Sequence, residues 1–355
     1  MVTLREIADA VGVSSGTVSR VLNYDQTLSI SEAKRQAIIE TAEALNYETP
    51  RNRNRRNAPT EPFAPSPTIT APIAILHFLR PDEELSDPYY VGVRLGIEGR
   101  CHDHRLETTK IFNTDEVRDS AALQAAAGMI VVGKHHPAVI AELTHTGKPV
   151  VFADFNPQLD QFDCVLADLG KATRMILEGL ALAGYQRIGF VGGYELMDDQ
   201  AVMYGEQRCK AYVQWHQESK RFDPALIALG QAETCARNLR LETGYEQARQ
   251  LLELPIRPDA ILCANDNMAI GTYRAIQEAG LSIPVDIAVA SFNDIPVTQF
   301  LNPPLSTMHI PGEPIGETAV DLLVERLMGR DYAKHITIPT RMRWRGSCRT
   351  PKITE

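Results

Sequence analysis

Long hydrophobic runs are missing from this 355-residue sequence, and none approaches the roughly 20 residues that cross a bilayer. The N-terminus also lacks the basic and apolar segments of a secretory signal peptide. Both absences disfavour membrane and secreted proteins, so we expect a cytoplasmic protein without a membrane partner. The six cysteines include no Cys-x-x-Cys pair, which favours reduced thiols and predicts no metal site.

An excess of positive charge is also absent, because the formal net charge is −9. This balance argues against a protein that coats nucleic acid over its whole surface. The charge is uneven, however. Residues 1–57 carry eight basic and seven acidic side chains, and four of the basic residues are arginines at positions 51, 53, 55 and 56. Local positive charge of this kind favours phosphate binding by the N-terminal segment.

Residues 3–47 show the pattern of three short helices. Thr3 and Glu6 make a capping-box motif, Gly12 breaks the first helix, and Ser14 is the expected N-cap of the second. A third helix is expected after Ser31. Apolar residues recur at helical spacing, at Leu4, Ile7, Ala8, Val11, Val18, Val21, Leu22, Ile38, Ala42 and Leu45. Short helices with a tight glycine turn are typical of a helix-turn-helix headpiece.

Residues 48–71 lose this periodicity. Prolines at positions 59, 62, 65 and 67 follow the arginine run, and such a segment cannot build a core. We therefore expect a headpiece at residues 1–47, an arginine- and proline-rich hinge or linker at 48–71, and a larger core at 72–355.

In the core, short apolar runs alternate with amphipathic stretches. The expected strands are 73–79, 128–132, 149–153, 187–192, 260–264 and 287–292, and the expected helices include 90–102, 172–183, 244–252 and 268–279. This alternation predicts an α/β fold of parallel sheets with helices on both faces.

Polar residues follow three of these strands. Asp154, the pair Asn265-Asp266 and the pair Asn293-Asp294 stand where the strands end. Ligands of such folds bind outside the carboxyl ends of the strands. A convergent set of carboxylates and amides suits a polyol ligand.

Several segments are similar to the LacI/GalR family of transcription repressors. The headpiece carries Thr3-Leu4-x-x-Ile7-Ala8-x-x-x-Gly12-Val13-Ser14-x-x-Thr17-Val18-Ser19-Arg20-Val21-Leu22-Asn23, and the core adds Pro258-Asp259-Ala260, Asn265-Asp266-x-Met268-Ala269-Ile270-Gly271, Ile283-Pro284-x-Asp286-Ile287 and Pro303-Pro304-Leu305-Ser306-Thr307. The resemblance covers essentially the whole chain. It implies a homodimer that binds double-stranded operator DNA, with the second helix of each headpiece in the major groove.

The resemblance also assigns roles within the headpiece. Ser15, Gly16 and Arg20 stand at base-reading positions, and the expected phosphate contacts are Thr3, Ser14, Thr17, Ser19 and Asn23. Arg20 can bind a guanine bidentately. Gly16 offers no side chain, so either Ser15 and Arg20 carry the specificity or Gly16 admits a base methyl at close range.

The hinge departs from the family pattern. Arg55 and Arg56 stand near the position of a leucine that usually wedges into the minor groove, and Arg53 precedes them. Arginine enters a narrow minor groove electrostatically, without an apolar wedge. A solvated arginine-rich segment is the alternative interpretation.

For the core, the resemblance implies two similar lobes joined by three crossovers, with residues 72–166 and 298–329 in lobe one and 167–297 and 330–355 in lobe two. An effector sugar is expected between them, at Tyr89, Tyr90, Asp154, Arg208, Asn265, Asn293 and Asp294. Residues 86–90 and 293–296 most resemble a repressor of β-galactosidase, which favours a galactoside. Both induction and corepression occur in the family. No leucine heptads follow residues 344–349, so a dimer is expected rather than a tetramer.

Other interpretations fit less well. An α/β enzyme with a fused DNA-binding domain would need a nucleophile and base, a metal set or a cofactor loop, and the sequence shows none, so we expect no cofactor. A sugar-transport protein would lack the headpiece. Residues 101–104, Cys-His-Asp-His, cannot converge on a metal from one helix unless that helix ends there. Residues 189–193 lack the ending of a phosphate-binding loop.

Overall fold

A computed structural model describes residues 3–22, 30–44, 69–112, 121–197, 200–202, 206–230 and 239–351. The chain divides into two compact units, Met1–Thr68 and Ile69–Glu355. We describe each unit by itself.

The N-terminal unit contains α1 (Leu4–Val11), α2 (Ser15–Leu22) and α3 (Glu32–Ala44). The capping box is confirmed, because the Glu6 N–H donates to Thr3 Oγ1 and the Thr3 N–H donates to Glu6 Oε2 at 2.6 Å. Gly12 ends α1 in the left-handed conformation, at φ 69°. Ser14 caps α2 as predicted, accepting the Thr17 N–H at 3.1 Å.

One small apolar cluster holds these helices together. Its buried members are Ile7, Ala8, Val18, Val21, Ile38 and Ala42, all of them among the apolar residues that recur at helical spacing. The opposite face of α2 presents Ser15, Gly16 and Arg20 to solvent. The sequence pattern therefore leaves one face of α2 available to a partner.

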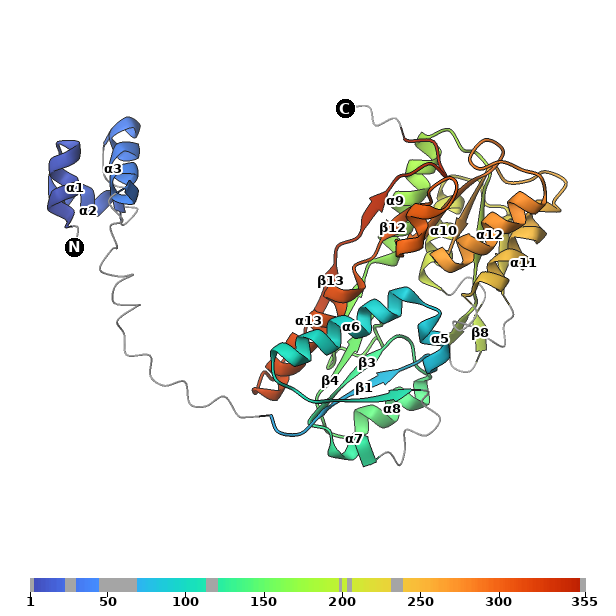
Figure 1. Ribbon diagram of the computed structural model, residues 1–355, viewed down its shortest axis with the longest axis horizontal. Helices are drawn as coiled ribbons and strands as arrows, with labels where there is room; N and C mark the ends of the chain where they lie inside the picture. The colour runs from blue at the N-terminus through green and yellow to red at the C-terminus, as the bar shows by residue number, and fades with distance from the viewer. Residues whose placement is uncertain are drawn as a thin grey trace. The chain divides into compact units, whose positions relative to one another are not determined.

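The second unit is an α/β core (Figure 1). Among the described residues, its helices are α5 (Pro81–Leu85), α6 (Pro88–Asp103), α7 (Ala121–Ala125), α8 (Pro137–His145), α9 (Leu169–Leu182), α10 (Gln207–Glu218), α11 (Leu241–Leu252), α12 (Asp266–Glu278) and α13 (Gly312–Leu327). Its strands are β1 (Ile73–His77), β2 (Thr108–Phe112), β3 (Gly128–Val132), β4 (Val150–Ala153), β5 (Asp163–Ala167), β6 (Ile188–Gly192), β7 (Glu195–Met197), β8 (Gln200–Val202), β9 (Ile227–Leu229), β10 (Ala260–Cys263), β11 (Ala288–Asn293), β12 (Ser306–His309), β13 (His335–Ile338) and β14 (Arg341–Arg343).

These strands form two large sheets. The lobe-one sheet has the order β13-β5-β4-β3-β1-β2, and the lobe-two sheet has the order β14-β12-β11-β10-β6-β9. Every pairing in them is parallel except that of β14 with β12. The central strands β1, β3, β4 and β6 are buried along their whole length, as expected for parallel sheets covered by helices on both faces. The predicted fold class is confirmed.

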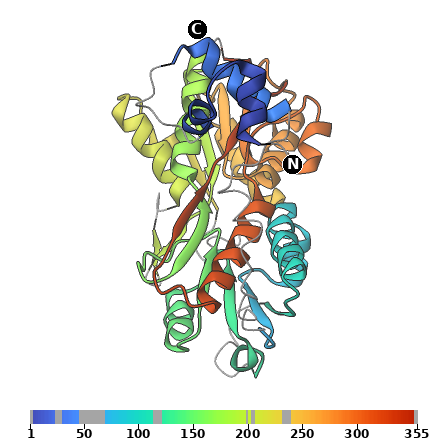
Figure 2. The same ribbon diagram turned by 90° about the vertical axis from the view of Figure 1, so that its left-hand side faces the viewer.

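The chain passes between the lobes three times, and Figure 2 shows the two lobes end to end with the third crossover running from one to the other. The first crossover follows β5, which ends at Ala167, one residue beyond the expected boundary at 166/167. The other two boundaries at 297/298 and 329/330 were wrong. Ser306–His309 pairs with β11 and so belongs to lobe two, whereas His335–Ile338 pairs with β5 and so belongs to lobe one. Both strands are short and rich in polar residues, so no apolar run marked them.

Close packing of α11 against α12 fixes the part of lobe two that faces lobe one. A Cβ at Gly271 would collide with the backbone of Leu241, and a Cβ at Gly244 would collide with the backbone of Met268. Glycine at both positions lets the two helix backbones approach closely. This contact sets the position of the N-terminus of α12.

Candidate functional site

A cavity of about 560 Å³ lies between the two lobes. Lobe one lines it with residues at the ends of β1, β3, β4 and β5, and lobe two with residues that follow β6, β10, β11 and β12 or that begin α10 and α11. The cavity therefore lies at the carboxyl ends of both parallel sheets, where the sequence placed the ligand. The expected effector residues that line it are Tyr89, Tyr90, Asp154, Arg208, Asn265 and Asn293.

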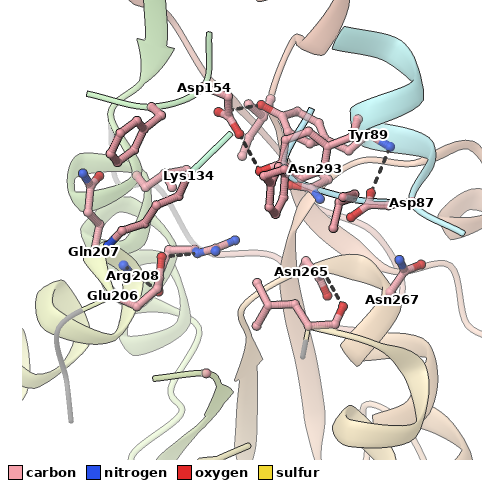
Figure 3. A pocket seen from close by; sticks show the side chains of 18 of the residues that line it. Asp87, Tyr89, Lys134, Asp154, Glu206, Gln207, Arg208, Asn265, Asn267 and Asn293 are labelled. Atoms are coloured by element: carbon pink, nitrogen blue, oxygen red, sulfur yellow. Dashed lines mark hydrogen bonds and ion pairs between the residues drawn. The ribbon is translucent and has the colours of Figure 1, made fainter. Parts of the chain in front are cut away.

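Two tyrosine hydroxyls converge on one carboxylate in the lining of this cavity (Figure 3). Tyr89 Oη donates to Asp154 Oδ1 at 2.9 Å, and Tyr90 Oη donates to Asp154 Oδ2 at 3.0 Å. The first turn of α6 carries both tyrosines, and Asp154 leaves β4 with a left-handed backbone, at φ 59°. Burial raises the pKa of Asp154, which the tyrosine hydroxyls oppose, and burial also raises the tyrosine pKa values well above 10.

Asp87 begins α6 beside these tyrosines. Its Oδ1 accepts the backbone N–H of Tyr89 at 3.2 Å, which makes it the N-cap of the helix. Burial raises the pKa of Asp87 to about 6, and the nearby charge of Asp154 adds to this rise. Asp87 was not among the expected effector residues, although an Asp directly before Pro88 is a signal for the start of a helix.

An aromatic wall adjoins the tyrosines. The Phe78 and Tyr90 rings meet edge to face with centroids 4.9 Å apart, and Tyr89 and Tyr90 pack in the same way at 5.0 Å. Aromatic surface beside polar groups is the usual lining of a small-molecule site.

Arg208 enters the cavity from the start of α10. Its Nε donates to Glu206 Oε1 at 2.9 Å, another N–H donates to the carbonyl of Ala264, and its guanidinium carbon lies 5.7 Å from the centroid of Phe292. Only 11% of the side chain is exposed. A buried guanidinium held on three sides offers its remaining N–H groups to a ligand in a fixed direction.

The three asparagines of lobe two differ in the hydrogen bonds that their side-chain amides make within the protein. Asn265 accepts the Met268 N–H at 2.9 Å and donates to the Leu239 carbonyl at 2.9 Å, so both polar ends of its amide bond within the protein. Asn267 Nδ2 donates to the Ser86 carbonyl of lobe one at 3.1 Å. Asn293 lines the cavity at the end of β11, with φ 107°.

Asp294 does not line the cavity. Its carboxylate instead pairs with Arg345 at 2.7 Å and lies 3.4 Å from His309. The neighbouring Asp266 is fully buried and accepts hydrogen bonds from the Ser291 and Thr307 hydroxyls and from the Ile295 N–H. Both aspartates therefore anchor lobe two rather than face a ligand.

Lys134, Glu206, Gln207 and Asn267 also line the cavity and were missed from the sequence. Each is a polar residue in a connecting segment or at a helix start, where polar residues are common whether or not they bind anything. Parallel sheets bring the carboxyl ends of their strands together at one edge. Lys134 stands two residues after β3, and this position is the one signal that could have indicated it.

Two contacts cross directly from lobe one to lobe two near the cavity. Glu83 Oε1 accepts a hydrogen bond from Arg240 Nη2 at 2.6 Å, and the Ser86 carbonyl accepts the amide of Asn267. All four residues line the cavity. These contacts between the lobes therefore adjoin the cavity.

In the headpiece, the expected DNA-contacting residues that the structure describes lie at the starts of α1 and α2 and along α2. Ser14 and Thr17 hydroxyls share a 2.8 Å hydrogen bond, and the Thr3 hydroxyl donates to Glu6. Thr3, Ser14, Ser15, Gly16 and Arg20 are exposed, whereas Thr17 and Ser19 are half-buried. Asn23, Arg53, Arg55 and Arg56 lie outside the described residues.

No helix in the described ranges is long and apolar enough to cross a membrane. Across the same ranges, no group of three or more His, Cys, Asp and Glu side chains could hold a metal ion. Cys101 is buried on α6, and His104 instead approaches Asp321 at 3.0 Å.

Two family models match the chain. Bacterial regulatory proteins of the lacI family match residues 3–50, and the periplasmic binding protein-like domain matches residues 177–348. The HTH-type transcriptional repressor MelR of Bacillus subtilis (strain 168) is 32% identical over 354 residues, which cover 98% of each protein. The chain belongs to the LacI/GalR family of transcription repressors. It is a repressor with a DNA-binding headpiece and a sugar-binding-like core.

A second relative is more similar over a shorter span. The lactose operon repressor of Rhizobium radiobacter is 76% identical over 113 residues, which are 32% of this chain and 100% of that sequence. Among solved structures, the Lac repressor dimer bound to operator and the anti-inducer ONPF has a TM-score of 0.64 at 24% identity, covering 98% of each chain. This likeness shows that the two chains share a fold.

Proposed function

We propose that the protein represses transcription with an operator affinity controlled by a galactoside bound between the lobes of its core. The observation that carries this proposal is the convergence of Tyr89 and Tyr90 on Asp154 inside a cavity between the lobes. The name of the 76% identical relative, lactose operon repressor, supports a galactoside as the effector.

The polar groups of the cavity match the chemistry of a neutral sugar. Each oxygen of Asp154 accepts one tyrosine hydroxyl and has capacity for another donor, and Arg208 has N–H groups beyond those given to Glu206 and Ala264. A sugar hydroxyl both donates and accepts, so it can bridge a carboxylate and a guanidinium. The Tyr89, Tyr90 and Phe78 wall suits the apolar face of the ring. Asn293 completes the ligand contacts, while Asn265 positions α12.

The headpiece binds the operator through α2. We assign base contacts to Ser15, Gly16 and Arg20, which share the exposed face of that helix. We assign phosphate contacts to the hydroxyl residues Thr3, Ser14, Thr17 and Ser19 together with Asn23, and hinge contacts to Arg53, Arg55 and Arg56. Two copies of the chain bind the two half-sites as a homodimer.

Effector and operator are coupled through the relative position of the lobes. Glu83 with Arg240, and Ser86 with Asn267, join lobe one to lobe two at the cavity, so a ligand there changes the balance between lobe arrangements. If one arrangement places the two headpieces of a dimer at the half-site spacing, effector binding changes operator affinity. Operator binding then changes effector affinity by the same factor.

A thermal-unfolding panel of galactosides, glucosides and pentoses tests the effector assignment. Galactosides should raise the unfolding temperature of the wild-type protein and leave that of an Asp154→Asn variant unchanged, because ligand binding stabilises only a protein that binds it. The variant keeps the size of the side chain and serves as the matched control. An equal response to all three sugar classes, or none to galactosides, contradicts the proposal.

A further inference from the structure

We propose that Glu206 makes the cavity select neutral sugars. It holds the Arg208 guanidinium in place and cancels its charge, so that a sugar carrying a carboxylate or a phosphate binds weakly. This inference rests on the proposed function, because it takes the ligand of the cavity to be a galactoside. It goes further by naming the residue that distinguishes neutral from ionised galactosyl compounds.

Glu206 is the N-cap of α10, and its carboxylate lies over the first turn of that helix (Figure 3). Its Oε2 accepts the backbone N–H groups of Arg208 at 3.0 Å and of Cys209 at 3.2 Å. Its Oε1 accepts Arg208 Nε at 2.9 Å. The two backbone N–H groups belong to the start of a helix, where they have no partner within the helix, and they fix the carboxylate. The carboxylate in turn fixes the guanidinium of the side chain two residues further along.

The pair of Glu206 and Arg208 is shielded from water. The Glu206 side chain is 14% exposed, and the Arg208 guanidinium also contacts the Ala264 carbonyl and the Phe292 ring. Salt and water screen such a pair much less than a pair on the surface. Burial lowers the pKa of Arg208, but the charge and the hydrogen bond of Glu206 outweigh burial and raise that pKa above its ordinary value. The guanidinium therefore stays charged, and Glu206 is the carboxylate that balances it.

The other charges of the cavity do not favour an anion. Arg240 is already paired with Glu83. Among the described lining residues, six are acidic and four are basic: Asp82, Glu83, Asp87, Asp154, Glu206 and Glu242 against Lys134, Arg208, Lys210 and Arg240. An ionised sugar therefore meets an excess of like charge, which disfavours it relative to a neutral sugar. A neutral hydroxyl can still accept the remaining N–H groups of Arg208.

Capping of α10 is the alternative role for Glu206, and substitutions at this position separate the two roles. Aspartate keeps both the charge and a strong N-cap, glutamine keeps the length without the charge, and serine is a strong N-cap without the charge. A role in capping alone predicts changes in unfolding temperature. A role in charge selection predicts a change in the ratio of affinities for a neutral and an ionised ligand.

Calorimetry on the full-length protein measures this ratio. The ligands are methyl galactoside, the methyl glycoside of galacturonic acid, in which a carboxylate replaces the C6 hydroxymethyl group, and galactose 1-phosphate. The wild-type protein should bind the neutral ligand at least about tenfold more tightly than either anion. Glu206→Gln and Glu206→Ser should each lower this ratio by about tenfold for at least one anion, because Arg208 is then unbalanced. Glu206→Asp should keep the wild-type ratio within about twofold, even where its absolute affinities fall.

Glu218→Gln provides the control. Glu218 also lies on α10 and pairs with an arginine, Arg174, at 2.7 Å, but it does not line the cavity. This variant should keep the wild-type ratio. Binding of any of the three ligands shows that a variant is folded.

Four results overturn the role of Glu206 while the proposed function stands. They are an unchanged ratio in both uncharged variants, loss of all three ligands by both of them, an equal shift in Glu206→Asp, and tighter binding of an anion than of methyl galactoside by the wild type. If the wild type binds no galactoside, the proposed function fails and the role of Glu206 fails with it.

Discussion

Glu83 of lobe one and Arg240 of lobe two form an ion pair with 2.6 Å between Oε1 and Nη2. The Glu83 side chain is 6% exposed and that of Arg240 is 51% exposed, so the pair closes the rim of the cavity with one partner in solvent. An ion pair this exposed contributes little to folding stability. The pair matters instead for the relative position of the lobes, because separating the lobes would break it.

Removing Arg240 should therefore affect the effector more than the fold. Arg240→Ala should weaken galactoside binding several-fold, because the lobe arrangement with the pair intact is less populated, and should change the free energy of unfolding by less than about 1 kcal/mol. Calorimetry and chemical denaturation measure the two quantities. Arg80 also approaches Glu83, at 3.3 Å, but from within lobe one. If Arg80→Ala weakens binding as much as Arg240→Ala, the pair has no role between the lobes.

The buried carboxylate of Asp266 should make stability depend on pH. Burial raises its pKa to about 7, against the Ser291, Ile295 and Thr307 hydrogen bonds that lower it. The folded state then holds the proton more tightly than the unfolded state, whose pKa is near 3.9, so this contribution is complete below about pH 4 and is lost as pH rises to about 7. Unfolding free energies from pH 5 to 8 should fall more steeply for the wild type than for Asp266→Asn. Parallel pH profiles would rule out this role.

Gly16 separates the stability of the headpiece from its DNA recognition. A Cβ at Gly16 would meet only Ser14 Oγ, at 3.7 Å, so Gly16→Ala fits and should stabilise α2 by up to about 1 kcal/mol. If Gly16 admits a base methyl, the same change should weaken operator binding. Gly170 is the matched control, since it also stands second in its helix, α9, and a Cβ there would meet Asp168 Oδ1 at 3.5 Å. Gly170→Ala should leave operator affinity unchanged, and the same outcome for Gly16→Ala would sink the close-approach interpretation.

Arg20 should carry base specificity. Arg20→Ala should cost about 1–3 kcal/mol of operator binding and relax the preference at one base pair, as measured by fluorescence anisotropy on operator variants at fixed salt. Lys34→Ala removes a charge from the exposed surface of α3 and should alter affinity equally for all operator sequences. A uniform loss for Arg20→Ala would assign Arg20 to phosphate instead of to a base.

The sequence predicted this fold where residues close together in the chain determine the structure. The capping box at Thr3, the turn at Gly12 and the buried strands all depend on residues only a few positions apart in the chain. The family resemblance then supplied Tyr89, Tyr90, Asp154 and Arg208, and the structure places these together in the cavity.

The predictions that differ from the structure concern residues whose surroundings are set by partners far away in the chain. Asn293 and Asp294 are adjacent, but both have positive φ, and the chain turns so that Asn293 lines the cavity while Asp294 pairs with Arg345. That partner is 51 residues further along the chain, and no local pattern could reveal it. The strands β12 and β13 were assigned to the wrong lobes because only their partners, β11 and β5, identify them as strands.

The coupling of galactoside binding to operator binding is tested most directly by operator affinity measured with and without a saturating galactoside at fixed salt. The wild-type protein should change its operator affinity by at least about fivefold, the lower range of measured coupling between sites. Asp154→Asn should retain the wild-type affinity in the absence of sugar and show no change on its addition. An operator affinity of the wild-type protein that no galactoside alters would contradict the account.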